Sequence, residues 1–403
     1  MQDQILVLNS GSSSLKVDVF SFEREDHGVA LAEAMAERVG TPEIQIQIKR
    51  AGNEREQIAP RGQEPDAALE CILDAFLAHG IFPPERRLGI GHRVVHGGAR
   101  FTTPVRIDAK TRAGIETCSE LAPLHNPANL AGIDAAMRLF PMEQVAVFDT
   151  AFHASMPEVA RTYAIPFELA GKHGLRRYGF HGSSHAYVGE LAAGLLGRPF
   201  ADCRIITLHL GNGASACAIH NGQSVDTSMG FTPLEGLVMG TRSGDIDPAL
   251  VSLIGERENL SPAEVETLLN RKSGLLGLSG KSDMRDLLEL AESSPDSPDR
   301  ERARLARDVF CYRIRKYVGA YLAVLNGADA LVFTGGIGEN AADIRARCCE
   351  GLAFAGIQID PDRNANPRNF RLSPEAAPTA VFAIPTDEER HIARQTRRLL
   401  RSA

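Results

Sequence analysis

Four short segments gather arginine, histidine, aspartate and glycine, and each follows an apolar run. They are HRVVHGG (92–98), FDTAFH (148–153), RRYGFHGSSH (176–185) and GTRSGDIDP (240–248). Segments that follow the strands of an α/β sheet lie where such sheets bind ligands. Arginine and histidine suit anions, and phosphoryl transfer needs charge neutralisation and alignment more than covalent chemistry. The segments therefore indicate a site for an anionic reaction, although each alone also fits a structural role.

Glycine-rich turns offer backbone N–H groups that bind anions. LNSGSSSLK (8–16) forms such a concave turn, with hydroxyls and a lysine as further donors. GNGASA (211–216) and GGIGEN (335–340) lack the full G-x-G-x-x-G of a dinucleotide fold. GGIGEN follows a strand pattern and precedes a helical run from Ala341, which predicts N–H groups at a helix N-terminus. LLGLSGKS (275–282) lacks the first glycine of a Walker loop, and we expect a glycine-rich loop there.

The elements that position these segments repeat along the chain. Strand patterns at 5–8 and 15–19 flank the first glycine turn, and a similar series recurs at 205–210, 211–213 and 214–219. Two copies suggest two related halves of an α/β protein. Apolar residues at helical spacing predict the helices 65–78, 129–139, 184–196 and 302–325. We expect an N-terminal domain of residues 1–150 plus about 386–403, and a C-terminal domain of residues 151–385.

Composition narrows the class of protein. The 403 residues carry a formal charge of −7 and no tryptophan, which argues against nucleic acid and anionic lipid as partners. No window is long and apolar enough to span a bilayer. The seven cysteines lack C-x-x-C spacing, which favours a reducing, cytoplasmic setting. We interpret the terminal arginines as the solvated face of a last helix: Arg394, Arg397, Arg398 and Arg401.

The sequence resembles the acetate kinase family from Leu6 to about Thr396. The motifs that carry the likeness are LNSGSSSLK, HRVVHGG, PLHNP, VFDTAFH, RRYGFHGSSH, HLGNGAS, GTRSGDIDP, TGGIGEN and TDEERHIA. The resemblance implies a two-domain, duplicated ribonuclease-H-like α/β fold, shared with actin, sugar kinases and heat-shock chaperone ATPases. It implies an interdomain ATP cleft, a nucleotide-binding C-terminal domain and a homodimer. The implied reaction is reversible, direct in-line transfer of the ATP γ-phosphoryl to acetate, which gives acetyl phosphate and ADP.

The resemblance also assigns residues to roles. The implied Mg²⁺ site, which Mn²⁺ can also fill, consists of Asn9 and Glu388. The implied catalytic residues are Arg93, Asp149, His181 and Arg242. The implied substrate pocket holds the carboxylate on Arg93 and the methyl group against Val95, Leu124, Phe180 and Pro233. The implied nucleotide contacts are Lys16, His209, Leu210, Gly211, Asn212, Gly213, Asp283, Met284, Arg285, Gly336, Ile337, Gly338, Glu339 and Asn340.

The family usually assigns Asp149 as the acid or base, with His181 and Arg242 as donors to the phosphoryl. Acetate is already ionised near neutral pH, so no base is needed to make the nucleophile. We therefore interpret Asp149 as a residue that orients an arginine or a magnesium-bound water. A phospho-enzyme on Glu388 ranks below direct transfer, because a metal ligand is poorly placed to act as a nucleophile.

Two alternatives remain open. One is a propionate kinase of the same family, because one methylene changes binding by only about 1–3 kcal/mol. The other is an actin-like or chaperone-like protein in which ATP drives a binding cycle. The chain also departs from the family pattern, which often has Ala, Thr, Asn and an apolar residue at the positions of Ser10, Ser183, Asp387 and Arg390. The extra carboxylate of Asp387 stands beside the implied metal ligand Glu388.

Overall fold

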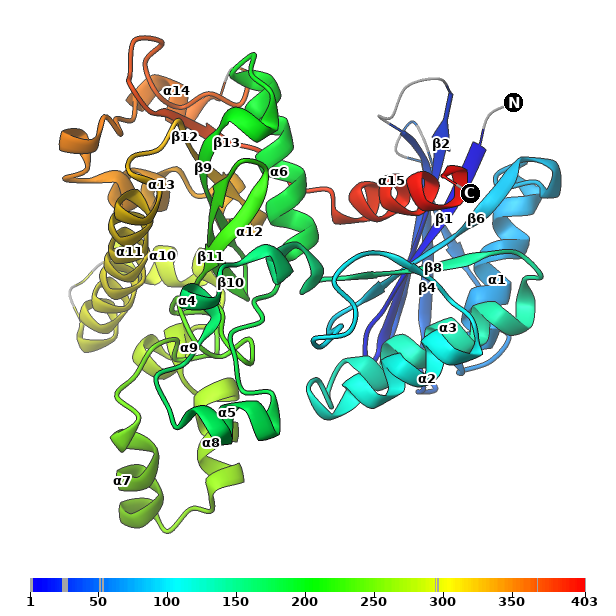
Figure 1. The fold of residues 1–403 in the computed structure, drawn as a ribbon, viewed down its shortest axis with the longest axis horizontal. Helices are drawn as coiled ribbons and strands as arrows, with labels where there is room; N and C mark the ends of the chain where they lie inside the picture. The colour runs from blue at the N-terminus through cyan, green and yellow to red at the C-terminus, as the bar shows by residue number, and fades with distance from the viewer. Residues whose placement is uncertain are drawn as a thin grey trace. The chain divides into compact units, whose positions relative to one another are not determined.

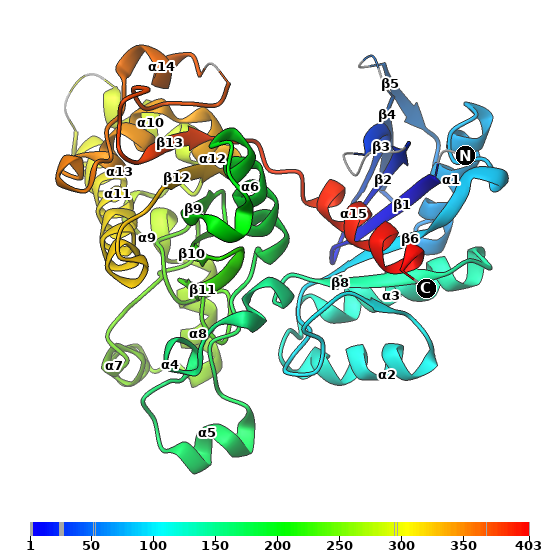
Figure 2. The same ribbon diagram turned by 45° about the horizontal axis from the view of Figure 1, so that its top comes forward.

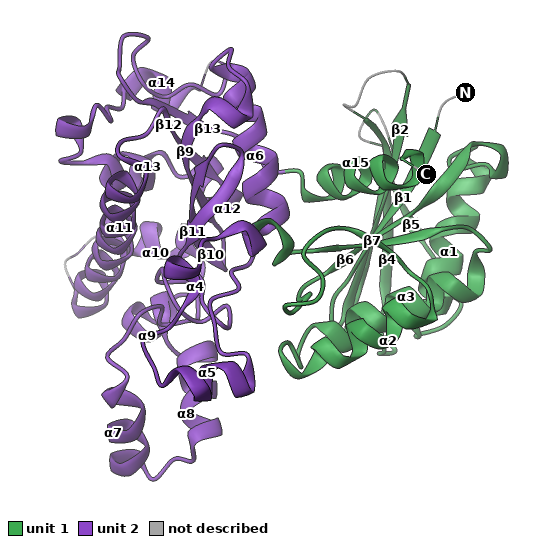
Figure 3. Ribbon diagram, viewed as in Figure 1, with its two compact units in different colours: residues 1–152, 387–403 green, residues 153–386 purple. Residues whose placement is uncertain are grey.

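The chain divides into two compact units, each built around one β-sheet (Figure 3). The computed structural model describes residues 3–23, 28–50, 52, 54–293, 295, 297–367 and 369–402. Unit 1 comprises residues 1–152 and 387–403, and unit 2 comprises residues 153–386. No helix in these described ranges is long and apolar enough to cross a bilayer.

Unit 1 carries an eight-stranded sheet in the order β5-β4-β3-β2-β1-β6-β8-β7. Its strands are β1 (Asp3–Ser10), β2 (Ser14–Phe22), β3 (Val29–Glu37), β4 (Gln45–Arg50), β5 (Arg55–Ile58), β6 (Arg87–Val94), β7 (Val105–Arg106) and β8 (Gln144–Phe148). Its helices are α1 (Pro65–Ala78), α2 (Ala109–Thr117), α3 (Asn126–Leu139) and α15 (Glu388–Arg401), with 3-10 turns η1 (Pro84–Arg86) and η2 (Cys118–Glu120). The 3-10 turn η3 (Ala151–Ser155) follows β8.

The alternation of side chains along β1 gives unit 1 two core layers. Ile5 and Val7 are buried together with Ile392 of α15. Leu6 and Leu8 point to the opposite face and are buried with residues of α1 and α3. Figure 1 shows α15 on one face of this sheet and α1 and α3 on the other. The last helix of the chain is therefore part of the core of the first unit.

Unit 2 carries a five-stranded sheet in the order β11-β10-β9-β12-β13. Its strands are β9 (Arg204–Leu210), β10 (Ala214–His220), β11 (Gln223–Thr227), β12 (Ala330–Thr334) and β13 (Ala380–Ala383). The helices before β12 are α4 (Glu158–Arg161), α5 (Phe167–His173), α6 (Gly182–Leu195), α7 (Ala249–Glu258), α8 (Pro262–Arg271), α9 (Gly274–Ser279), α10 (Met284–Glu292) and α11 (Pro298–Leu325). The later helices are α12 (Gly335–Asn340), α13 (Ala342–Cys349) and α14 (Pro361–Ala365), and the 3-10 turns are η4 (Phe200–Asp202) and η5 (Ala353–Ala355). Helices α6 and α11 cover opposite faces of the sheet (Figure 1 and Figure 2).

The two sheets share one topology, which confirms the predicted duplication. In unit 1 the order β3-β2-β1-β6-β8 has antiparallel pairs on one side of β1 and parallel pairs on the other. In unit 2 the order β11-β10-β9-β12-β13 repeats this pattern around β9. In each unit a glycine turn joins the first two strands. The predicted α/β fold class is confirmed, whereas the expected ATP cleft between domains stays a prediction.

Two local predictions are wrong. The segment 275–282 is not a loop throughout, because α9 spans Gly274–Ser279 and leaves only residues 280–282 outside a helix. Its first N–H groups are satisfied by the carbonyls of Met239 and Gly240, to which Leu275 and Leu276 donate at 2.9 Å. GGIGEN is not a plain turn either, because α12 begins at Gly335, whereas the predicted helical run from Ala341 is confirmed by α13.

The terminal arginines do not form one solvated face, which corrects a third prediction. Arg394 is only 7% exposed. The Nε atoms of Arg397 and Arg401 lie 3.2 and 3.1 Å from Oδ2 of Asp3. Two of these arginines therefore fasten α15 to the start of β1, a pairing that spans nearly the whole chain.

The buried His92 should make unit 1 sensitive to acid. Its Nε2 lies 2.8 Å from Gln144 Oε1, and burial lowers its pKa from 6.5 to about 4. The unfolded chain binds this proton below pH 6.5, whereas the folded chain does not until about pH 4. Stability present above pH 6.5 is therefore lost as pH falls, by about 2 kcal/mol at pH 5.

We expect His92→Gln to flatten the decline of the unfolding free energy between about pH 6.5 and pH 4.5, measured by urea denaturation. His173→Gln, at an exposed position on α5, is the control and should leave the decline unchanged. An equally steep decline in both variants would contradict the assignment of this proton to His92.

Candidate active site

An arginine–aspartate pair stands at the ends of two neighbouring strands in unit 1. Because β6 and β8 run parallel, with Val94 opposite Phe148, their carboxyl ends meet at one edge of the sheet. Nε and Nη2 of Arg93 donate to Oδ1 and Oδ2 of Asp149 at 3.0 and 2.7 Å. Asp149 is 1% exposed. Burial opposes the charge of Arg93, but the carboxylates of Asp149 and Glu388 raise its pKa above the usual value.

The bidentate pair uses only one edge of the guanidinium. Nη1 of Arg93 donates to Asn9 Oδ1 at 3.3 Å, a long contact. The edge formed by Nη1 and Nη2 therefore keeps donor capacity for an anion, in the fork geometry that suits a carboxylate. Asp149 thus contacts an arginine, as one of the two roles that we expect for it requires, whereas its role in the reaction stays a prediction.

Lys16 is held against the first turn of α15. Its Nζ lies 3.0 Å from Glu389 Oε1 and 3.7 Å from Asp18 Oδ2. Asn9, opposite Lys16 in the β1–β2 ladder, donates from Nδ2 to the same Glu389 oxygen at 3.4 Å. Glu389 was not among the predicted site residues, because acidic residues are common in the first turn of a helix, where they complement the helix dipole.

Glu388 carries an unsatisfied oxygen that fits a divalent cation. Its Oε2 is buried without a hydrogen-bond partner in the part of the chain described, and it lies 4.0 Å from Arg93 Nε. Burial raises the pKa of Glu388 to about 7, against the attraction of Arg93. Within the described ranges, no group of three or more His, Cys, Asp or Glu can enclose a metal. Because Mg²⁺ keeps several waters, Glu388 and the amide oxygen of Asn9 fit a hydrated Mg²⁺.

The two departures from the family pattern beside this site form one pair. Asp387 is the N-cap of α15, and its Oδ1 accepts from the N–H of Arg390 at 2.9 Å. Its Oδ2 accepts from Arg390 Nε at 2.7 Å. The added negative and positive charges therefore offset each other, and the Asp387 carboxylate is occupied in capping the helix that carries Glu388.

In unit 2, His181 and Arg242 converge on the glycine turn 211–213. A Cβ atom added to Gly213 would lie 3.6 Å from both Arg242 Nη1 and His181 Nε2. The rings of His181 and His209 stack, with centroids 4.2 Å apart. Burial lowers the pKa of Arg242, and no salt bridge to it occurs within the described residues. An anion beside this turn would offset the cost of burying that guanidinium.

A cavity of about 760 Å³ in unit 2 gathers eight of the residues that the resemblance assigns to the nucleotide. They are Gly211, Asn212, Asp283, Met284, Arg285, Gly336, Ile337 and Asn340. The sequence did not single out three further lining residues, Ser282, Leu288 and Ala341. The side chains of Met284, Leu288 and Ile337 offer apolar surface that suits a planar base.

The other assigned residues do not line this cavity. Lys16 belongs to unit 1, and the rest of this group is His209, Leu210, Gly213, Gly338 and Glu339. Oε1 of Glu339 accepts from the N–H groups of Gly335 and Thr386, at 3.0 and 3.2 Å. Glu339 therefore ties α12 to the end of unit 2.

The residues assigned to the methyl pocket differ in burial. Val95 and Phe180 are 8% and 3% exposed, whereas Leu124 is 64% exposed. Val95 and Leu124 belong to unit 1, and Phe180 and Pro233 belong to unit 2. In unit 1, Val95 is buried two residues after Arg93, whereas Leu124 is exposed and lies outside a closed apolar pocket.

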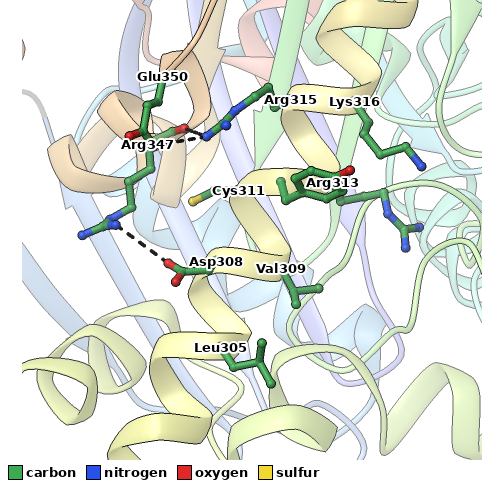
Figure 4. A pocket seen from close by; sticks show the side chains of 10 residues that line it. Leu305, Asp308, Val309, Cys311, Arg313, Arg315, Lys316, Arg347 and Glu350 are labelled. Atoms are coloured by element: carbon green, nitrogen blue, oxygen red, sulfur yellow. Dashed lines mark hydrogen bonds and ion pairs between the residues drawn. The ribbon is translucent and has the colours of Figure 1, made fainter.

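A second cavity of unit 2, of about 480 Å³, lies along α11 and α13. Figure 4 shows Arg347 directed to Asp308 and Arg315 directed to Glu350, with Cys311 between these pairs. Its lining includes none of the residues that the resemblance assigns.

The comparisons with known proteins agree over nearly the whole chain. The model of the acetokinase family matches residues 4–394. An acetate kinase of Heliobacterium modesticaldum is 47% identical over 98% of this chain and 99% of its own length. A crystal structure of Porphyromonas gingivalis acetate kinase has a TM-score of 0.91 and 43% identity, covering 99% of this chain and 100% of its own. A propionate kinase from Francisella tularensis has a TM-score of 0.89 and 41% identity, covering 98% of both chains.

These matches define the class of the protein. It is an α/β protein of two sheet-containing units with the fold of the solved acetate kinase. The chain belongs to the acetokinase family.

Removal of the Asp149 charge should destabilise unit 1. Asp149→Asn leaves the half-buried Arg93 guanidinium without its buried carboxylate partner, and we expect the unfolding free energy to fall by about 3 kcal/mol. Arg112 pairs with Asp134 in the same bidentate way, at 2.7 and 2.8 Å, but near the surface. Asp134→Asn should therefore cost less than about 1 kcal/mol. Equal losses in the two variants, measured by urea denaturation, would contradict a special role of the Arg93–Asp149 pair.

Proposed function

We propose that this protein is an acetate kinase, which transfers the γ-phosphoryl of ATP reversibly to acetate and gives acetyl phosphate and ADP. The observation that carries the proposal is the family match over residues 4–394, joined to an arginine that is held ready for a carboxylate. The bidentate contact fixes Arg93 before substrate arrives, so little entropy is lost when an anion binds.

Unit 1 supplies the acceptor and metal side of the reaction. The acetate carboxylate binds the Nη1–Nη2 edge of Arg93, and its methyl group packs on Val95. Asp149 keeps the guanidinium in place and takes no proton, because acetate is already ionised. Bound Mg²⁺ would neutralise charge on the phosphates, and Asn9 and Glu388 would hold it with several waters.

Unit 2 supplies the nucleotide side. The nucleoside occupies the cavity around Met284 and Ile337, and the phosphates reach the turn 211–213. An acetate oxygen forms a bond to the γ-phosphorus while the bond to the β–γ bridging oxygen breaks, and ADP leaves. His181 and Arg242 donate hydrogen bonds to the phosphoryl oxygens, where negative charge is spread in the transition state.

We extend the proposal to four further properties. The two units correspond to an N-terminal domain of residues 1–150 plus about 386–403 and a nucleotide-binding domain of residues 151–385, which the compact units support. The resemblance supports a homodimer and Mg²⁺, with Mn²⁺ as a substitute. The cytoplasmic location rests on the sequence alone.

Propionate is the second candidate substrate, because the Francisella tularensis relative is a propionate kinase with 41% identity. Val95 is the residue of unit 1 that limits the length of the acyl group in this proposal. A smaller side chain at this position would admit one more methylene.

Formation of acetyl phosphate tests the proposed function directly. With ATP, Mg²⁺ and acetate, hydroxylamine should trap acetyl hydroxamate, and a chelator of Mg²⁺ should abolish the product. Arg93→Lys keeps the charge but loses the fork, so we expect kcat/KM for acetate to fall roughly hundredfold. Arg106→Lys, an exposed arginine of β7, should leave kcat/KM unchanged. ATP hydrolysis without any trapped product would favour the chaperone-like alternative.

Substrate length tests the role of Val95. The wild type should prefer acetate, and Val95→Ala should raise the ratio of kcat/KM for propionate to that for acetate by roughly tenfold. Val105→Ala on β7 is the matched control and should not alter the ratio. A wild-type preference for propionate would overturn the choice of acetate.

A further inference from the structure

Three buried polar side chains connect His181 to the interior of unit 2. We propose that Thr207, His185 and Ser215 form a hydrogen-bond relay that fixes the proton of His181 on Nε2. His181 then donates to the transferring phosphoryl as a neutral imidazole. This inference rests on the proposed function for the role of His181, but the relay itself is a property of unit 2 alone.

The relay runs through one face of the sheet. Thr207 lies on β9 and Ser215 on β10, beneath the N-terminal turn of α6 that carries His181 and His185. Thr207 Oγ1 lies 2.7 Å from His185 Nδ1, and His185 Nε2 lies 2.7 Å from Ser215 Oγ. Ser215 Oγ lies 2.8 Å from His181 Nδ1. Thr207, His185 and Ser215 are each 0% exposed, so water does not replace any link.

The direction of the protons follows from the inner end of the relay. Each hydroxyl has one proton to donate. In the part of the chain that the structure describes, the hydroxyl of Thr207 has one hydrogen-bond partner, His185 Nδ1. If this hydroxyl accepted from His185, its own proton would be buried without an acceptor, which costs about 1–3 kcal/mol. Thr207 therefore donates to His185 Nδ1.

Each later step is then determined. Burial lowers the pKa of His185 well below its usual value, so its imidazole is neutral and has one N–H. With Nδ1 accepting from Thr207, that N–H is on Nε2 and donates to Ser215 Oγ. The Ser215 proton is left for His181 Nδ1. An imidazole that accepts at Nδ1 carries its proton on Nε2.

The backbone of His181 supports a fixed role for this ring. His181 adopts φ of 57°, a left-handed conformation that is uncommon for a residue with a side chain. It is the N-cap residue of α6 and lacks a side-chain capping bond there. The side chain is instead directed to Ser215, with Nε2 beside Gly213.

The relay gives His181 and Arg242, the two donors of unit 2, different roles. Conversion of His181 to an imidazolium would require Nδ1 to donate to Ser215 Oγ. The Ser215 proton or, if all three links reversed, the Thr207 proton would then be buried without an acceptor. The positive charge at the phosphoryl therefore comes from Arg242, whereas His181 contributes an aligned neutral N–H. Thr207, His185 and Ser215 are positioning residues, because they act through His181.

Nitrogen NMR of the histidine-labelled protein tests the relay without any substrate. A protonated and an unprotonated ring nitrogen give well-separated signals, and the loss of signals in His181→Gln assigns those of His181. We expect Nε2 to be protonated and Nδ1 unprotonated near pH 7.5. His153 is an internal reference, because its Nε2 lies 2.9 Å from the Phe180 carbonyl, which only accepts. Protonation of Nδ1 in wild-type His181 would overturn the proposal.

Three variants add a functional readout. Thr207→Val and Ser215→Ala should give a mixed tautomer at His181 and lower kcat by roughly tenfold or more, with KM for ATP and acetate within about twofold. Thr207→Ser should restore both properties. Thr227→Val is the matched control, because the buried Thr227 hydroxyl donates to the Ala216 carbonyl and to no histidine. A Thr207→Val protein with wild-type tautomer and kcat would contradict the relay.

The two proposals fail in different ways. A wild-type protein that forms no acetyl phosphate, but carries the expected His181 tautomer, would overturn the proposed function and leave the relay standing. A protein that forms acetyl phosphate with His181 protonated on Nδ1 would overturn the relay alone.

Discussion

The contact between Arg93 and Asp149 is the constraint on which the candidate site of unit 1 depends. A guanidinium that binds a carboxylate substrate needs one edge held in place and one edge left exposed. Because the parallel strands β6 and β8 end together, Asp149 can hold one edge of Arg93 and leave the other exposed. The surrounding carboxylates keep Arg93 charged despite its burial. The orphaned oxygen of Glu388 then marks where a further positive charge fits. In the proposed function, binding of an anion and binding of a cation are thus parts of one electrostatic arrangement.

The hydrogen-bond donors of unit 2 are also held in place, but by different contacts. Its donors are placed by a relay and by a glycine turn rather than by a carboxylate partner. Asp149 and Ser215 each stand behind a donor and set its orientation, one as an acceptor of two N–H groups and the other as a link between two imidazoles. The duplicated topology therefore carries two unlike sets of polar contacts at the ends of equivalent strands.

Local patterns predicted most of the fold. The helix 65–78 was predicted with its observed bounds, and the recurrence of strand, glycine turn and strand predicted the duplication. The errors arose where distant carbonyls decide the structure, as at α9, which Met239 and Gly240 stabilise. Arg394 was misjudged because a charged residue is normally exposed, and only the tertiary contact of α15 reveals its burial. The relay behind His181 was invisible, because Thr207 lies in no motif. Ser215 closes the motif HLGNGAS, but its histidine partners lie on another element.

The position of α15 at the end of the chain affects the order in which the two units fold during synthesis. Unit 2 is one continuous stretch of chain, whereas the sheet of unit 1 waits for residues 387–402 to cover one of its faces. Domains fold as units while the ribosome elongates the chain. Residues 153–386 can therefore complete their core before the earlier-made unit 1, which stays with bare apolar strands until the last helix emerges. In this period unit 1 exposes apolar surface that is prone to aggregation.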